Sequence, residues 1–332
     1  MLRSFANARS RSRFARVMLP VLVAFTLGGC GMFGSDDPVT PPARVESLRL
    51  VDSQTLPGLG AGQGVAVRDG LVYLYGDADP GVIREYRLIW AAPPYLEPTG
   101  RSIALTIAGI DTVPHPTGLT FHPEHGTYLG NTVAGVGTIH KIDFEKALAR
   151  GSLDGCVLRT IADDAAVNGT RPEFVRLAGR WLIATSDYGD TNNQVRLYDP
   201  AKLSTARSTA EPGVLVDSYP CGPWVQSLHW IDAAETLVLV QNQVEGLGYR
   251  LTTVRLDGPK DLRKARKFDL KQPADELAGF AIVSGQRSIL FSASSERNVW
   301  FAVVGLRDLA AERRAKEQQQ GRRPYNPVTG KR

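Results

Sequence analysis

Residues 64–75 read GVAVRDGLVYLY, which is a short apolar segment, a polar turn and a second apolar segment. β-Branched and aromatic side chains favour β-strands, and an Asp-Gly pair is a strong signal for a tight hairpin turn. A third apolar run follows a polar loop, at residues 82–88. The stretch therefore predicts three antiparallel strands joined by short connections.

The same order of strand, turn, strand, loop and strand recurs along the chain. Five copies start at residues 64, 118, 174, 227 and 279, at intervals of 54, 56, 53 and 52 residues. A fourth apolar run separates consecutive copies, at residues 103–107, 157–161, 214–217 and 265–270. Four short strands repeated at this period are typical of a β-propeller, in which each blade is a small twisted sheet. We predict an all-β, five-bladed β-propeller with four-stranded blades over residues 46–304; the alternative is six blades, one of them degenerate.

The fifth copy has no fourth strand after residue 304, whereas an unpaired apolar run at residues 46–51 precedes the first copy. We predict that this run completes the last blade, because ring closure removes the unpaired edges of a linear array. Closure joins segments about 250 residues apart. The entropic cost of closing so long a loop is only slightly larger than that of a shorter one, because this cost grows with the logarithm of loop length.

The copies resemble the blades of NHL-like and related propellers, in which a Gly-Val-Ala-Val strand leads through a turn into an aromatic-rich second strand. The resemblance covers about residues 46–304 and concerns architecture. It implies the fold and carries no activity, because propellers host many unrelated functions.

The first 29 residues are typical of a targeting segment. They contain five Arg and no acidic residue, and residues 17–27 are almost wholly apolar. That run is shorter than the ~20 apolar residues that span a bilayer. It ends in Leu27-Gly28-Gly29-Cys30, where small residues precede a cysteine.

Leu27-Gly28-Gly29-Cys30 resembles the lipobox of bacterial lipoproteins. The resemblance implies a signal peptide over residues 1–29, cleavage before Cys30 and acylation of Cys30, which would anchor the protein to membrane lipid. Residues 30–45 are rich in Gly, Asp and Pro and predict a flexible tether. Residue 31 is Gly rather than Asp, which by analogy with the family favours the outer membrane facing the periplasm. An ordinary secretory signal, or a short core helix, remains the alternative.

The formal net charge of +5 is concentrated at the two ends of the chain. The first 29 residues contribute +5, and the tail at residues 305–332 contributes 8 − 3 = +5, so residues 30–304 carry about −5. This balance argues against a nucleic-acid partner, which would need a basic body. We expect the tail to be a peripheral basic helix followed by a disordered end.

Two cysteines follow Cys30, namely Cys156 and Cys221. Cys156 opens the outermost strand of one blade, and Cys221 follows the outermost strand of the next blade. These two strands run in the same direction, so the two thiols should lie at opposite ends of the propeller. A disulfide needs Cα atoms within about 7 Å. We therefore predict no disulfide.

The loops between second and third strands share one end of a propeller with the segments that lead into the first strands. We call this end the upper face. The candidate ligand-binding residues on it are Gln63, Asp77, Thr117, Arg171, Glu173, Asp187, Asp190, Gln226, Gln241 and Glu276. Convergent polar groups over a packed scaffold are the default binding-site hypothesis. Gln63, Thr117, Glu173 and Gln226 should begin the innermost strands, with Glu276 displaced by two residues.

Two functions fit this face. The first is non-catalytic binding of a glycan or an envelope protein, in a scaffold role. The alternative is hydrolysis of a glycan or ester by paired carboxylates chosen from Glu173, Asp187 and Glu276. The sequence contains no nucleophile-elbow, zinc-protease or phosphate-loop motif. We expect no cofactor and no metal, and interpret residues 186–193 as a tight turn rather than a Ca²⁺ loop.

Overall fold

The computed structural model describes residues 43–244, 248–258, 265–270 and 276–309, together with 311, 312, 314, 315 and 318. The predicted signal peptide, Cys30 and most of the predicted tether lie outside these residues. The propeller is therefore described by itself.

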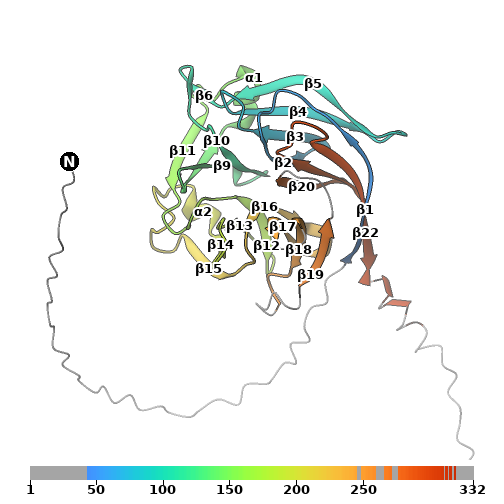
Figure 1. Ribbon diagram of the computed structural model, residues 1–332. Coiled ribbons are helices and arrows are strands. Elements are labelled where there is room, and N and C mark those ends of the chain that lie inside the picture. The colour runs from blue at the N-terminus through green and yellow to red at the C-terminus, as the bar shows by residue number, and fades with distance from the viewer. Residues whose placement is uncertain are drawn as a thin grey trace, which may run out of the picture. The chain divides into compact units, whose positions relative to one another are not determined.

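The described chain forms five four-stranded antiparallel sheets, each with its strands in sequence order except the last (Figure 1). Blade 1 contains β2 (Gly62–Arg68), β3 (Leu71–Gly76), β4 (Val82–Ile89) and β5 (Tyr95–Ala104). Blade 2 contains β8 (Pro116–His122), β9 (Gly126–Val133), β10 (Val136–Ile142) and β11 (Val157–Ala162). Blade 3 contains β12 (Glu173–Leu177), β13 (Arg180–Ser186), β14 (Gln194–Tyr198) and β15 (Leu215–Pro220). Blade 4 contains β16 (Val225–Ile231), β17 (Thr236–Val244), β18 (Gly248–Val254) and β19 (Arg266–Leu270). Blade 5 contains β20 (Leu277–Ser284), β21 (Arg287–Ser292), β22 (Val299–Asp308) and β1 (Ala43–Gln54).

The innermost strands contact one another in a closed order: β2 with β8, β8 with β12, β12 with β16, β16 with β20, and β20 with β2. Apolar side chains fill the space between neighbouring blades. Leu119 and Leu129 of blade 2, for example, pack with Tyr73 and Ile83 of blade 1. The five-bladed propeller is thus confirmed, and the six-bladed alternative is wrong.

The predicted closing strand is also confirmed. β1 pairs antiparallel with β22, from Ala43 opposite Asp308 to Gln54 opposite Val299. Figure 1 shows the two strands side by side although they lie at opposite ends of the described chain. On the side facing blade 4, the guanidinium of Arg266 donates to Glu46 Oε2 at 3.0 Å. β1 therefore completes blade 5 and also ties it to blade 4.

Outer elements depart from the sequence expectation. β5 begins at Tyr95, eight residues before the predicted strand, and the hairpin of β6 (Thr106–Ile107) and β7 (Ile110–Asp111) follows it. β5 is an outer strand with few buried positions, so its apolar pattern is weak. The α-helices α1 (Phe144–Arg150) and α2 (Pro200–Leu203), and the 3-10 turn η1 (Asp232–Ala234), were not predicted.

The two helices replace polar connections between third and fourth strands. Asp143 and Asp199 cap them by accepting from backbone N–H groups of Lys146 and of Ala201. β22 continues to Asp308, four residues beyond its expected end, and Ala311 and Glu312 in the tail are helical.

Cys156 and Cys221 are both free, as predicted. Within the described residues, no helix is both long and apolar enough to cross a bilayer.

The closing strand gives a test of the ring. Val45 on β1 is 6 % exposed, whereas Val51 on the same strand is 42 % exposed. Val45→Asp places a charge among apolar side chains, so we expect it to lower the free energy of unfolding by about 2–4 kcal/mol. Val51→Asp is the matched control and should change it by less than about 0.5 kcal/mol. Denaturant unfolding followed by circular dichroism measures both, and equal effects would contradict the closure.

Candidate functional site

The strand register defines which residues are equivalent in the five blades. In blades 1, 2, 4 and 5 the innermost strand has a β-bulge at its start. Its first and third residues pair with the second strand, and its second residue is skipped. The skipped residues are Gln63, Thr117, Gln226 and Ala278. Such β-bulges re-aim side chains at the rims of closed sheets.

Blade 3 completes this ring with Arg171. Glu173 pairs with Ala184 as Gly64 pairs with Tyr75 in blade 1, and no residue of β12 is skipped. Arg171 lies two residues before β12 and joins the ring through a hydrogen bond from its Nε to the backbone oxygen of Gln226. We call Gln63, Thr117, Arg171, Gln226 and Ala278 the bulge ring. All five are nearly buried, with at most 5 % of each residue exposed.

The register corrects the expected position of Glu173. It is equivalent to Gly64, Gly118, Ser227 and Gly279, and not to Gln63 and Thr117. Glu276 likewise lies two positions before the ring, where Ala278 stands. The third repeat therefore starts at residue 173, and the intervals become 54, 55, 54 and 52 residues. The apolar Phe174 resembled a strand start, which produced the shift.

Hydrogen bonds join the bulge ring across blades. Gln226 Nε2 donates to Gln63 Oε1 at 3.2 Å, although the two residues are 163 positions apart. Arg171 Nε donates to the backbone oxygen of Gln226 at 3.0 Å. Thr117 Oγ1 donates to the backbone oxygen of Thr170 at 2.5 Å. The ring is thus a polar layer in which four blades are linked near the axis.

A second set of residues surrounds this layer, and we call it the rim. It consists of the residues two positions before each bulge-ring residue, which are Ala61, His115, Gly169, Trp224 and Glu276. In blades 1, 2, 4 and 5 their backbone oxygens accept from the residue at the end of the second strand, at 2.9–3.2 Å. Tyr188, from the loop between β13 and β14, extends over the layer. We call the bulge ring, these rim residues, Asp77 and Tyr188 the channel mouth.

Aromatic and charged groups meet at the channel mouth. The Arg171 guanidinium carbon lies 5.0 Å from the centre of the Tyr188 ring, and that ring lies 5.2 Å from the ring of Trp224. His115 Nδ1 lies 3.7 Å from Asp77 Oδ2, to which Gln63 Nε2 also donates. The rim side chains of His115 and Trp224 therefore each contact a neighbour on another blade.

Burial sets the protonation of these groups. It lowers the pKa of Arg171 to about 10, so the guanidinium still carries a positive charge at neutral pH. Burial also lowers the pKa of His115, which the nearby Asp77 opposes and the Arg171 charge reinforces. Burial and Glu276 together raise the pKa of Tyr188. At neutral pH the mouth therefore presents a cationic Arg171 beside neutral His115 and Tyr188.

Glu173 begins β12 two residues after Arg171 and lies below the mouth. The backbone N–H of Trp230 donates to its Oε1 at 2.9 Å, and His229 Nδ1 lies 3.7 Å from the same oxygen. Burial raises the pKa of Glu173 to about 8 and lowers that of His229 to about 4. Both groups are therefore neutral at pH 7, and Glu173 is a buried carboxylic acid.

Asp187 holds its loop in place. It is fully buried and accepts from the backbone N–H groups of Val167 and Gln194 at 2.6 and 2.9 Å, and from Arg196 Nη1 at 2.5 Å. Such a buried pair is costly to break, because the remaining charge would be uncompensated. Asp187 thus orders the loop that carries Tyr188.

The other predicted residues have separate places. Gln241 is buried, donates to the backbone oxygen of Pro223 and accepts from Thr252 Oγ1. Asp190 is exposed and accepts from Thr191. In the described part of the chain no group of His, Cys, Asp and Glu is arranged to hold a metal ion. The structure brings together Gln63, Asp77, Thr117, Arg171, Gln226 and Glu276, and leaves Glu173, Asp187, Asp190 and Gln241 outside this set.

The candidate set from the sequence omitted the aromatic residues Tyr188 and Trp224. A signal existed for Trp224, because it lies two positions before Gln226, as His115 lies before Thr117. Tyr188 comes from a loop whose conformation depends on the buried Asp187, so its position is not apparent from local sequence.

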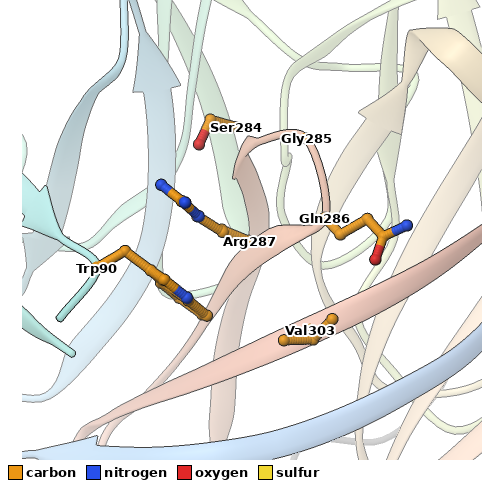
Figure 2. A pocket seen from close by; sticks show the side chains of 6 residues that line it. All are labelled: Trp90, Ser284, Gly285, Gln286, Arg287 and Val303. Carbon is orange, nitrogen blue, oxygen red and sulfur yellow. The ribbon is translucent and has the colours of Figure 1, made fainter. Parts of the chain in front are cut away.

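A second concave feature lies at the opposite end of the blades. A cleft of about 430 Å³ is lined by Trp90, Ser284, Gly285, Gln286, Arg287 and Val303. Figure 2 shows the Arg287 side chain beside Trp90, and its guanidinium carbon lies 5.6 Å from the ring centre. The cleft joins the end of β4 to the turn between β20 and β21, at the seam of blades 1 and 5.

No protein-family model matches the sequence, and no curated protein matches it. Solved structures with similar folds include hydrazine synthase from Kuenenia stuttgartiensis (10 % identity, TM-score 0.39), of which the chain spans 57 % while 72 % of this chain is covered. The PQQ-bound aldose sugar dehydrogenase from Streptomyces coelicolor has 13 % identity and a TM-score of 0.43, with 80 % of this chain and 100 % of that one covered. A protein of unknown function from Desulfotomaculum acetoxidans has 15 % identity and a TM-score of 0.34, over 60 % and 56 % of the two chains. These likenesses are distant, and the propeller assignment rests on the strand pairing described above.

Glu173 yields a pH-dependent prediction. Its pKa is raised from 4.5 to about 8 on folding, so its contribution to stability is complete below pH 4.5 and is lost as the pH rises towards 8. Glu173→Gln keeps an oxygen acceptor for Trp230 without a titrating proton. We expect the unfolding midpoint of the variant, relative to wild type, to rise progressively between pH 5 and 8. Thermal unfolding measures this difference, with Glu97→Gln on the surface as control; a difference independent of pH would contradict the raised pKa.

Proposed function

We propose that this protein is a lipid-anchored protein of the bacterial envelope that binds a ligand at the channel mouth of its propeller. The observation that carries the binding role is the bulge ring. The starts of the innermost strands of all five blades converge there, and four of them supply polar side chains beneath an aromatic and ionic rim. A rigid scaffold that gathers polar groups from many strands is suited to recognition.

The sequence supports the anchoring half of the proposal. The Arg-rich start, the apolar run and Leu27-Gly28-Gly29-Cys30 occur in the order of a lipoprotein signal. Lipid at Cys30 would hold the propeller at a membrane surface through residues 31–42. The outer membrane facing the periplasm is the proposed location, and an envelope protein or a glycan is the proposed partner class.

Hydrolysis by paired carboxylates has less support. Both oxygens of Asp187 are occupied by Arg196 and by two backbone N–H groups. Glu173 is a neutral acid below the bulge ring, and its Oε1 accepts from the backbone of Trp230. These bonds favour structural roles for the two residues, so binding is the better account of the mouth.

The anchor is tested at Cys30. We expect the mature N-terminal peptide of the native protein to begin at Cys30 and to carry acyl chains, since its thiol and new amino group are the acceptors. Cys30→Ala should remain unprocessed and unacylated, whereas Cys221→Ala should behave as wild type. Mass spectrometry of the membrane fraction measures both the cleavage site and the acylation of Cys30. An unmodified Cys30 in the wild type would refute the anchor.

The binding role is tested at the rim. Tyr188→Ala removes the aromatic group that extends over Arg171, whereas His125→Ala changes the opposite end of the blades. We expect immobilised wild type and His125→Ala to retain the same envelope component, and Tyr188→Ala to lose it at least about tenfold. Mass spectrometry of eluates identifies the component. Release of a cleaved product by the wild type would instead favour the hydrolase.

A further inference from the structure

The bulge ring contains one charged side chain. The four residues that the bulges skip, Gln63, Thr117, Gln226 and Ala278, are neutral. The cation is Arg171, which lies two residues before β12 of blade 3.

Arg171 is buried without an anionic partner. Only 3 % of the residue is exposed, and within the described chain no carboxylate lies within 4.0 Å of its guanidinium. Its two protein acceptors are backbone oxygens, of Gln226 at 3.0 Å from Nε and of Ser186 at 3.5 Å from Nη1. The nearest loop carboxylate, Asp187, is bound to Arg196 instead. A buried charge that lacks an ion pair is costly, so a compensating anion would stabilise it.

The segment before β12 packs closely beside this guanidinium. A Cβ at residue 169 would lie 3.2 Å from Arg171 Nη1 and 2.6 Å from Thr132 Oγ1. The backbone there has φ of +106°, which disfavours other residues. Glycine at this point therefore lets the chain pass next to Arg171 without a side chain that would crowd it.

We propose that Arg171 binds the oxyanion group, a carboxylate or a phosphate, of the ligand that the channel mouth receives. The inference rests on the proposed function and names the chemistry of its ligand. Charge-assisted hydrogen bonds from a buried guanidinium to such a group are among the stronger polar contacts in proteins. Tyr188 and Trp224 border the site and supply flat surfaces for the body of the ligand.

The experiment uses the full chain in neutral detergent, titrated at constant ionic strength with inorganic phosphate and with acetate. Intrinsic tryptophan fluorescence is the readout, because Trp224 lies on the rim. We expect saturable binding that is weakened at least about tenfold by Arg171→Gln. Arg287→Gln, which removes an exposed arginine from the cleft in Figure 2, should bind as wild type. A parallel titration with phosphatidylglycerol in the micelle distinguishes a lipid headgroup from a free anion.

Stability supplies the second measurement. Since Arg171 is a buried charge without a carboxylate within 4.0 Å, Arg171→Gln should unfold at the wild-type temperature or above it in the absence of anion. A large loss of stability would assign the charge to the fold and overturn the proposal. Anion binding that is equal in wild type and Arg171→Gln would overturn it as well.

The two proposals fail separately. Absence of anion binding, together with envelope capture that depends on Tyr188, refutes the oxyanion and leaves the binding role intact. Loss of the Tyr188-dependent capture, with retained anion binding at Arg171, refutes the partner class and leaves the oxyanion site.

Discussion

The pairing of β1 with β22 is the constraint on which the rest of the structure depends. It joins segments more than 200 residues apart and converts a row of five sheets into a ring. Without it, blade 5 would expose an unpaired strand edge. Closure also fixes the axis, and only a fixed axis brings equivalent positions of different blades to one point.

The bulge ring is a consequence of that closure. Each of the four bulges turns one residue out of the regular ladder at the same point of its blade, and this residue is polar in blades 1, 2 and 4. Their side chains therefore converge near the axis. The bond between Gln226 and Gln63 exists because blades 4 and 1 are held across the axis. The repeated fold therefore places one residue of each blade in the layer, and the identities of these residues determine its polarity and charge.

The sequence was sufficient to predict the blades and their closure, because innermost and second strands are buried on both faces and read as continuous apolar runs. It was insufficient for β5, whose side chains are mostly exposed, and for α1 and α2, which are too short to show helical periodicity. At the mouth it predicted Gln63, Thr117, Arg171 and Gln226. It misaligned Glu173 because strand register depends on pairing across blade 3, and one apolar residue, Phe174, was taken as the start of the strand.

Blade 3 supplies two ionisable residues near the start of its innermost strand, and they lie two residues apart. Arg171 precedes β12, and Glu173 stands where the other blades have Gly or Ser. An ionised Glu173 would offer a negative charge two residues from Arg171. Burial instead raises its pKa to about 8, against the hydrogen bonds from Trp230 and Thr120, so it stays protonated at neutral pH. The acid is therefore neutral at the pH where the guanidinium is charged, and the positive charge of Arg171 remains available at the mouth to a ligand rather than to the protein's own carboxyl group.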